Sequence, residues 1–212
     1  GSTVIPANTP AANALLEHLP PESAWGRQFL IGPFAGRNSG ALIRVYAATN
    51  GTVVTRNGSA VATLAPGAYY EYNLLQSSLD VVTTSAPALV AEYAFSVRTE
   101  TGFVVNVTKG DPTLLLVPPV EQFATRYTFQ AFDGFPALFE STPGIAFQSY
   151  VTLTVPTSST AGMVLDQQPI TASWVPIGSS GYSRTSIPIA AGAHVVHHVR
   201  PNVRFGAVVY GW

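Results

Sequence analysis

The stretch from residue 51 to residue 74, GTVVTRNGSAVATLAPGAYYEYNL, decides the fold class of this chain. Three runs within it, GTVVTR, AVATLA and AYYEYNL, alternate apolar and polar residues and are rich in the β-branched and aromatic types that strands favour. Asn57-Gly58 separates the first two runs and predicts a two-residue hairpin turn, because both residues tolerate a positive φ. The stretch therefore predicts consecutive β-strands.

The same alternation continues from ALIRVYAA (41–48) to FGAVVYGW (205–212), and Asn50-Gly51 predicts a second hairpin turn. A helical pattern is confined to TPAANALLEHLPP (9–21), which is stopped by Pro20-Pro21. We therefore predict an all-β protein, a β-sandwich built from two related tandem units, with a short N-terminal helix.

The evidence for two units is an internal similarity. TLAPGAYYEYN (63–73) aligns with PIAAGAHVVHH (188–198), which places Gly67 opposite Gly192 and Tyr69 opposite His194. Upstream of each segment, VVTRNGSAVATL and MVLDQQPITASW both predict strand, turn and strand. We divide the chain into an N-terminal segment with the helix (1–24), a first β-unit (25–110) and a second β-unit (111–212) packed closely on the first.

Composition excludes several classes of function. Only 10% of the 212 residues are charged, the net charge is −1, and the ten Lys and Arg form no basic stripe, so no nucleic-acid partner is expected. No apolar run reaches the roughly 18 residues of a membrane span, so we expect no membrane insertion. Cysteine is absent, which excludes disulfides, thiol nucleophiles and thiolate metal ligands.

The chain shows no pattern for catalysis or for a cofactor. GSSGYS (178–183) is not a nucleophile elbow, because a proline-containing strand follows it in place of a helix. His194 and His198 would share one face of a strand roughly 13 Å apart, with His197 on the other face, which does not suit a single metal ion. We predict no enzyme, no cofactor and no metal site, and we interpret these histidines as strand residues with hydrogen-bonded or solvated tips.

Aromatic residues in turns are the best candidates for a binding site, since Tyr and Trp offer a large apolar plane with a polar edge. In the AFDGF segment, Phe132, Asp133 and Phe135 surround a predicted turn. Tyr182 and Tyr69 also lie next to predicted turns. Each of these aromatic residues could instead belong to the hydrophobic core.

Three longer phrases resemble a known family: PPESAWGRQF (20–29), LLVPPVEQF (115–123) and PIGSSGYS (176–183). The resemblance is to the IgGFc-binding protein N-terminal domain family and runs from about Leu15 to the end of the chain. It implies an extracellular module of animal mucin-associated proteins or of bacterial surface and secreted proteins, and it implies no enzyme. One departure is Asp166-Gln167, which stands where relatives usually show Asp-Gly.

Together these observations predict an extracellular or cell-surface adhesion and recognition module, part of a larger surface or secreted protein, that binds glycans or glycoproteins. The alternative is a structural spacer or a self-assembling fibre or tip module, because self-assembling surfaces also have few charges at their centres. In that case we expect a homo-oligomer, either a trimer or a dimer.

Overall fold

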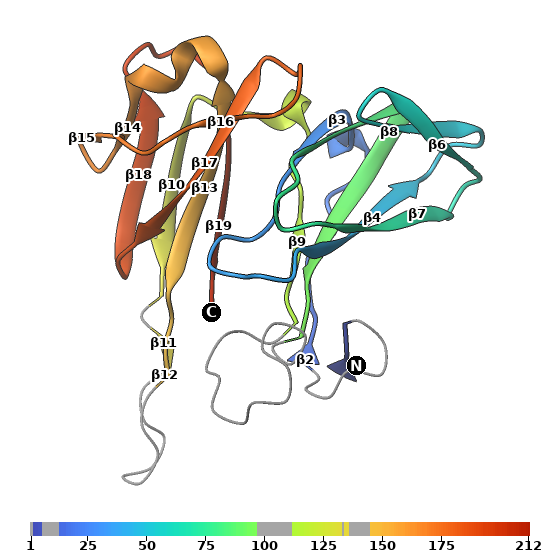
Figure 1. Ribbon diagram of the computed structural model, residues 1–212, viewed down its shortest axis with the longest axis horizontal. Helices are drawn as coiled ribbons and strands as arrows, with labels where there is room; N and C mark the ends of the chain where they lie inside the picture. The colour runs from blue at the N-terminus through green and yellow to red at the C-terminus, as the bar shows by residue number, and fades with distance from the viewer. Residues whose placement is uncertain (1, 6–12, 97–111, 133, 136–144) are drawn as a thin grey trace, which may run out of the picture. The chain divides into compact units, whose positions relative to one another are not determined.

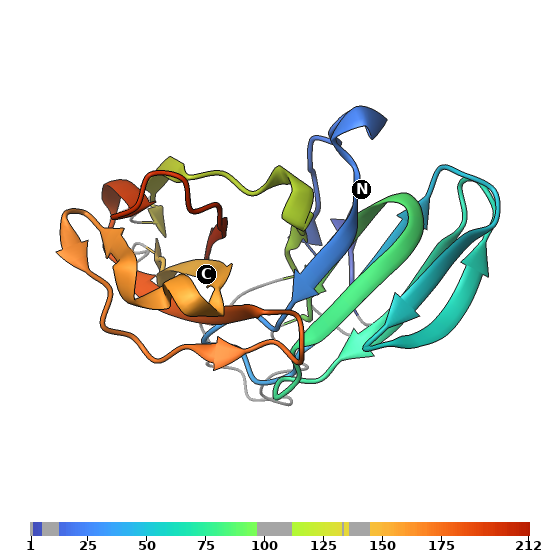
Figure 2. The same ribbon diagram turned by 90° about the horizontal axis from the view of Figure 1, so that it is seen from above.

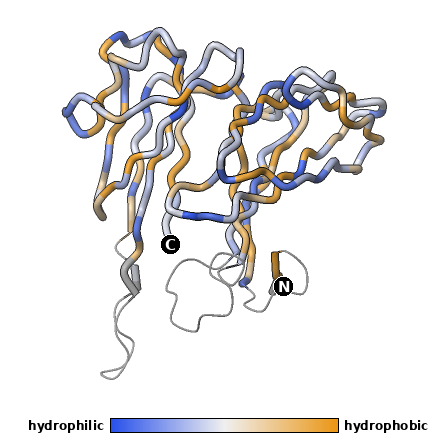
Figure 3. The backbone as a smooth tube through the Cα atoms, viewed as in Figure 1, coloured by the Kyte–Doolittle hydropathy of each residue, from blue (hydrophilic) through white to orange (hydrophobic). Residues whose placement is uncertain are grey.

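The computed structural model describes residues 2–5, 13–96, 112–132, 134–135 and 145–212 (Figure 1). This described part consists of β-strands, irregular connections and three short 3₁₀ helices, η1 (Glu22–Ala24), η2 (Val120–Gln122) and η3 (Thr157–Gly162). Hydrophobic and hydrophilic residues alternate along the strands (Figure 3), because successive side chains of a strand point to opposite faces of its sheet. The prediction of an all-β protein is confirmed.

The chain divides into two compact units, unit 1 (Gly1–Gln122) and unit 2 (Phe123–Trp212). The described strands of unit 1 are β1 (Ser2–Thr3), β2 (Asn13–Ala14), β3 (Gly26–Ile31), β4 (Ala41–Ala47), β5 (Thr52–Arg56), β6 (Ser59–Leu64), β7 (Tyr69–Leu74), β8 (Asp80–Ala94) and β9 (Leu114–Leu116). Those of unit 2 are β10 (Arg126–Ala131), β11 (Gly134–Phe135), β12 (Ile145–Ala146), β13 (Ser149–Pro156), β14 (Met163–Leu165), β15 (Gln168–Pro169), β16 (Val175–Pro176), β17 (Tyr182–Ile189), β18 (Gly192–His198) and β19 (Gly206–Gly211).

Unit 1 is organised around the long strand β8, in a sheet of order β6-β5-β8-β4-β7. The first part of β8 pairs with β5 and with β3, which Figure 2 shows in blue beside the green β8. The second part, after Pro87, pairs with β4 and β9. Every second residue of β4 is buried, and Ile43 and Val45 have no exposed surface. The opposite face of β4 is therefore left for polar and aromatic side chains.

Unit 2 contains two four-stranded antiparallel sheets, β10-β18-β14-β15 and β16-β17-β13-β19. One hydrophobic core receives side chains from both: Val151, Leu153 and Val155 come from β13, whereas Met163 and Val196 come from β14 and β18. All seven residues from Ser149 to Val155 are buried, which is why the sequence VTLTV reads as a strand covered on both faces.

The two units share one pattern of strand pairing. In unit 1, β8 pairs with β3, β4 and β5, β4 also pairs with β7, and β5 forms a hairpin with β6. In unit 2, β18 pairs with β10 and β14, β19 and β17 pair with β13, and β14 forms a hairpin with β15. Strands β18 and β19 thus correspond to the first and second parts of β8, and β17 corresponds to β7. This common pairing supports the prediction of two related units.

The pairing corrects the alignment made from the sequence. Gly67 and Gly192 both have a positive φ, of 76° and 132°. Gly67 precedes β7, whereas Gly192 begins β18, whose counterpart is the start of β8 and not β7. His194 therefore corresponds to Asp80, and not to Tyr69. A local Ala-Gly-Ala similarity does not determine which strand the following residues join.

The two predicted hairpin turns had different outcomes. Asn57-Gly58 joins the paired strands β5 and β6, as predicted, and Asp166-Gln167 joins β14 and β15. Asn50-Gly51 is not a hairpin turn, because it connects β4 to β5 and the sheet order places β8 between them. A turn signal predicts a change of direction, but the pairing of the strands depends on the rest of the unit.

The predicted N-terminal helix is not found in the described residues. Its residues 9–12 lie outside them, Asn13–Ala14 form β2, and residues 15–21 have no regular structure. Leu16 and Leu19 are 92% and 71% exposed. Because a helix this short depends on burial of an apolar face, these two leucines provide no packing that would stabilise it.

The sequence placed the junction between the units at residues 110 and 111, whereas the compact units meet between Gln122 and Phe123. Residues 112–122 form hydrogen bonds with the rest of unit 1. Strand β9 pairs with β8, the Val117 N–H donates to the Val90 carbonyl at 2.9 Å, and Glu121 Oε1 accepts from the Arg27 N–H at 2.8 Å.

In the described residues, no helix has the length and apolar character that a membrane span requires.

Candidate functional site

The candidate binding surface lies on the polar face of β4, β7 and β8 in unit 1. It consists of Arg44 and Tyr46 from β4, Tyr69 and Glu71 from β7, and Tyr93 from β8, and we call it the tyrosine–arginine face. In the register of the sheet, Arg44 lies opposite Glu71, and Tyr46 lies opposite Tyr69. The alternation that buries Ile43 and Val45 turns these side chains away from the core.

Arg44 is the centre of this face. Its Nε donates to Glu71 Oε2 at 2.6 Å, and its guanidinium carbon lies 4.9 Å from the centre of the Tyr69 ring and 5.3 Å from that of Tyr93. A carboxylate and two aromatic rings therefore fix the orientation of one cation. The Arg44 and Glu71 side chains remain 32% and 39% exposed, so the pair is accessible to a ligand.

The tyrosines form a connected set. The Tyr46 and Tyr93 hydroxyl oxygens are 3.2 Å apart, and the ring centres of Tyr46 and Tyr69 are 5.5 Å apart. Burial and the hydrogen bond with Tyr46 raise the pKa of Tyr93 to about 12, although Arg44 acts to lower it. The Tyr93 phenol is consequently neutral near pH 7 and can donate or accept a hydrogen bond.

This arrangement is suited to binding and offers no group for covalent catalysis. A neutral phenol, an ion-paired guanidinium and an exposed ring provide stacking and hydrogen bonding, but no activated nucleophile or pair of acid and base. Tyr and Arg are also the residue types that most often dominate binding energy in interfaces.

Two of the sequence-predicted site residues are exposed aromatics. Tyr69 is 48% exposed and lies on the tyrosine–arginine face of unit 1. Phe132 is 69% exposed and follows β10 in unit 2. The ligand-binding role of each stays a prediction.

The other predicted site residues do not gather at one place. Asp133 lies outside the described residues, and Phe135 lies in β11, opposite Ile145 of β12. Tyr182 is half-buried and its ring packs edge-on against Phe123, with the centres 5.8 Å apart.

Phe132 and Tyr182 lie near opposite ends of β13. The Phe132 carbonyl accepts from the Ser149 hydroxyl at 3.5 Å, whereas Tyr182 pairs with Pro156 at the other end of that strand. With a rise of about 3.3 Å per residue, these ends are roughly 23 Å apart. One small ligand could not contact both.

The corresponding face of unit 2 has different chemistry. Thr152 takes the place of Arg44, and its hydroxyl contacts those of Ser186 at 2.7 Å and Tyr210 at 2.8 Å. The Tyr210 ring stacks on Trp212, with centres 5.1 Å apart, and Trp212 is only 9% exposed. Thr152 and Trp212 are buried, Ser186 and Tyr210 are half-buried, and none of the four is charged, so this cluster offers less to a ligand than the face of unit 1.

The strand histidines are held by hydrogen bonds, as the sequence predicted. The ring of His198, for example, lies between the Ser159 carbonyl and the Arg200 N–H, at 2.9 and 2.8 Å. Among the residues that the structure describes, no three or more His, Cys, Asp or Glu side chains come close enough together to hold a metal ion.

Sequence reasoning missed four of the five residues of this face: Arg44, Tyr46, Glu71 and Tyr93. The alternation in ALIRVYAA does place Arg44 and Tyr46 on the polar side of a strand, so that signal was present. The contacts of Tyr93 with Arg44 and Tyr46 could not be predicted from the sequence, because they depend on the pairing of β8 with β4.

Comparisons with known proteins give one clear result. A family model described as "IgGFc binding protein" matches residues 1–211, nearly the whole chain. A search of curated proteins found no match. Among solved structures, the GH78 family rhamnosidase of Bacillus sp. GL1 matches with 11% identity and a TM-score of 0.24, over 87% of this chain and 31% of its own. The chain thus spans less than a third of that enzyme, and a TM-score this low carries no argument about activity.

Proposed function

The chain belongs to the IgGFc-binding protein family, and from this premise we propose that it is an extracellular recognition module whose tyrosine–arginine face binds glycans or glycoproteins. The family description is that of a binding protein, which favours recognition over catalysis. Both the choice of ligand and the choice of face are part of the proposal.

The observation that carries this proposal is the exposed ring of Tyr69 beside a cation of fixed orientation. A sugar ring has a C–H face that can pack on an aromatic ring and a rim of hydroxyl groups that need polar partners. Tyr69 provides the first, while Arg44, Glu71 and the hydroxyl groups of Tyr46 and Tyr93 provide the second. The same face suits a glycoprotein, since Tyr and Arg are frequent anchors in protein interfaces.

The rigidity of the face also favours binding. Its residues project from three hydrogen-bonded strands, and Arg44 is already paired before any ligand arrives. Little side-chain freedom would therefore be lost on binding, which lowers the entropic cost of association.

We would test the proposal with a glycan and glycoprotein array probed with a multimerised form of the chain. Tyr69→Ala should reduce binding tenfold or more, that is by at least about 1.4 kcal/mol, because it removes the exposed stacking surface. Phe132→Ala is the matched control, since it removes an even more exposed aromatic ring, from unit 2. Circular dichroism and thermal melting would show that both variants remain folded.

Each outcome is informative. Loss of binding in Phe132→Ala but not in Tyr69→Ala would move the site to the end of β10. No binding by the wild-type chain would argue against recognition and favour the structural spacer, and light scattering would then show whether the chain forms a dimer or trimer.

A further inference from the structure

In both units the hairpin turn is attached to a neighbouring strand by the same pair of hydrogen bonds, one between backbone groups and one from a backbone N–H to a side-chain oxygen of the turn. In unit 1, the Asn57 N–H donates to the Val81 carbonyl and Asn57 Oδ1 accepts from the Val81 N–H, both at 2.8 Å. In unit 2, the Asp166 N–H donates to the Val195 carbonyl at 2.9 Å and Asp166 Oδ1 accepts from the Val195 N–H at 2.8 Å. The residue before each valine also contacts the turn: Asp80 contacts Asn57 in unit 1, and His194 contacts Asp166 in unit 2.

In unit 1 this position holds the Asp80 carboxylate, whose partners are one amide and one guanidinium. Asp80 accepts from Asn57 Nδ2 at 2.7 Å and from Arg56 Nε at 2.8 Å, and its side chain is only 3% exposed. Arg56 also lies over the Tyr72 ring of β7, 4.0 Å from its centre. Arginine stays protonated at all ordinary pH values, so this arrangement is constant near neutral pH.

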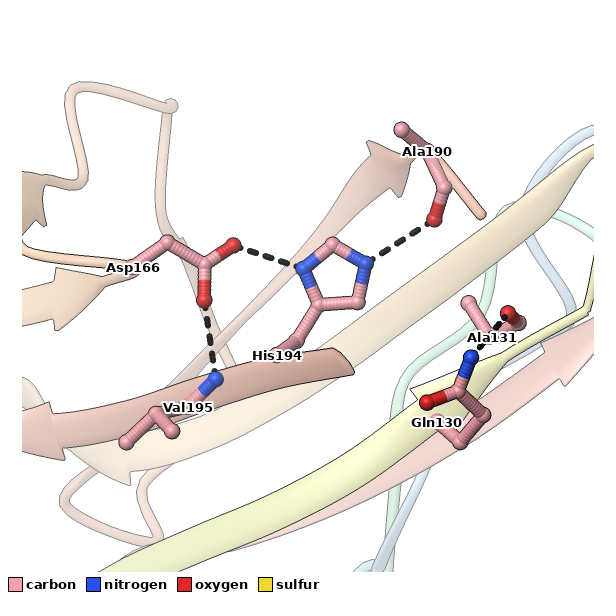
Figure 4. A network of polar contacts seen from close by, with 6 residues as sticks. All are labelled: Gln130, Ala131, Asp166, Ala190, His194 and Val195. Atoms are coloured by element: carbon pink, nitrogen blue, oxygen red, sulfur yellow. Dashed lines mark hydrogen bonds and ion pairs between the residues drawn. The ribbon is translucent and has the colours of Figure 1, made fainter. Parts of the chain in front are cut away.

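In unit 2 the position holds His194, and both of its ring nitrogens face acceptors (Figure 4). Nδ1 lies 2.6 Å from Asp166 Oδ2, and Nε2 lies 2.9 Å from the Ala190 carbonyl oxygen. Neutral imidazole has one N–H donor, whereas imidazolium has two. Only the protonated ring can make both hydrogen bonds.

These bonds connect the β14–β15 turn, the His194 ring and the connection that leads into β18. His194 lies on β18 and Asp166 in the β14–β15 turn, whereas Ala190 lies in the two-residue connection between β17, a strand of the other sheet, and β18. Strand β10 contributes the Phe129 ring, whose centre is 5.5 Å from that of His194. Within the described part of unit 2, Asp166 is the one charged side chain in contact with the imidazole.

We propose that Asp166, His194 and the Ala190 carbonyl form an acid-strengthened clasp in unit 2, which closes when the His194 ring is protonated and weakens when it loses its proton. Unit 1 lacks this dependence near neutral pH, because Asp80, Arg56 and Asn57 occupy the corresponding place. The module therefore has one unit in which the contact of the hairpin turn responds to pH and one in which it does not.

The direction of the pH effect follows from both partners. The hydrogen bond to Asp166 raises the pKa of His194 above its ordinary 6.5, so its stabilisation is complete below 6.5 and is lost as the pH rises through the higher folded value. Burial acts to raise the pKa of Asp166, but the hydrogen bonds with the His194 ring and the Val195 N–H, together with the charge of His194, outweigh burial and lower that pKa below 3.8. Stabilisation by Asp166 is thus present above 3.8 and lost as the pH falls through the folded value. The clasp is strongest between about 3.8 and 6.5.

We would test the clasp by NMR titration of the histidine ring protons in the full chain. In the wild type, His194 should titrate above 6.5, and the protection factor of the Val195 amide against hydrogen exchange, which corrects for the intrinsic rate at each pH, should fall as the pH rises through that value. Asp166→Asn should return the titration of His194 to 6.5 or below and remove the pH dependence of this protection factor. Asn57 has a φ of 50° at the equivalent turn position, against 49° for Asp166, so asparagine fits there.

His197→Gln is the control, because His197 shares β18 but its Nδ1 contacts the His198 carbonyl, at 3.2 Å, in place of a carboxylate. This variant should keep the wild-type titration of His194. His194→Gln provides a second test if Asp166→Asn does not fold, since it should remove the pH dependence of the Val195 protection factor. Titration of wild-type His194 at or below 6.5, or an unchanged titration in Asp166→Asn, would overturn the proposal.

Discussion

At the scale of single residues, the two hairpins differ in the second position of the turn. Both turns have two consecutive residues with a positive φ, 50° and 84° at Asn57 and Gly58, and 49° and 67° at Asp166 and Gln167. Glycine adopts this conformation without strain, whereas a residue with a Cβ is disfavoured there by roughly 1 kcal/mol or more. Gln167 is therefore a strained position in unit 2.

This comparison predicts opposite effects for two exchanges. Gln167→Gly should raise the free energy of unfolding of unit 2 by up to about 1 kcal/mol, and Gly58→Gln should lower that of unit 1 by a similar amount. A Cβ at Gly58 would meet nothing within 4 Å, so the backbone conformation alone would cause the loss. Denaturant unfolding of each variant provides the measurement, and a destabilised Gln167→Gly would contradict the explanation.

At the scale of strands, the ion pairs of unit 1 differ in burial more than in distance. Arg56–Asp80 and Arg44–Glu71 have N–O distances of 2.8 and 2.6 Å. The Asp80 carboxylate is 3% exposed and ties the β5–β6 hairpin to β8, whereas Glu71 is 39% exposed on an edge strand. When a buried carboxylate is removed, water cannot take its place and its donors are left without an acceptor. Water can take the place of an exposed carboxylate.

Asp80→Ala should therefore destabilise unit 1 by about 2 kcal/mol or more, because Asn57 and Arg56 lose their shared acceptor. Glu71→Ala should cost less than about 1 kcal/mol. Thermal and denaturant unfolding of the two variants would decide this, and equal losses would show that burial does not determine the contribution of these pairs.

The tyrosine–arginine face is also a property of strands, since its five residues come from β4, β7 and β8. Arg44→Lys keeps the charge but loses the planar group that lies beside the Tyr69 and Tyr93 rings. We expect it to weaken ligand binding several-fold with little change in stability, measured on the ligand that the array identifies. Wild-type affinity in this variant would mean that the guanidinium plane is not used.

At the scale of the whole molecule, the chain consists of two units with complete sheets of their own. In the described part of residues 123–212, every strand pairs with another strand of that range, and β9 pairs with β8 of unit 1. Residues 112–122 thus belong structurally to the first unit, although the sequence placed them in the second.

Truncation tests this boundary. A fragment of residues 123–212 should fold with the same stability as one of residues 111–212, because residues 111–122 add no strand to its sheets. A fragment ending at 110 should be less stable than one ending at 122, since it loses β9 and the Val117–Val90 bond. Circular dichroism and denaturant unfolding of the four fragments would show whether the junction lies at 122 or at 110.

The sequence by itself determined the local features of this protein. Alternation of apolar and polar residues identified most of the long strands, although not β3, and the all-β class. The turns at Asn57-Gly58 and Asp166-Gln167 identified two hairpins, and Tyr69 and Phe132 were recognised as candidates that prove to be exposed. These features depend on φ preferences and on burial of one strand face, and both are encoded within a few residues.

Only the tertiary structure decided which strands became neighbours. Pairing placed β8 between β5 and β4, which shows that Asn50-Gly51 is not a hairpin turn, brought Tyr93 to Arg44, and made His194 the counterpart of Asp80. These partners are far apart in sequence, and their choice depends on which arrangement buries all the apolar faces at once. No local pattern contains that information, because the same alternation can pair with several edges until the whole unit has folded.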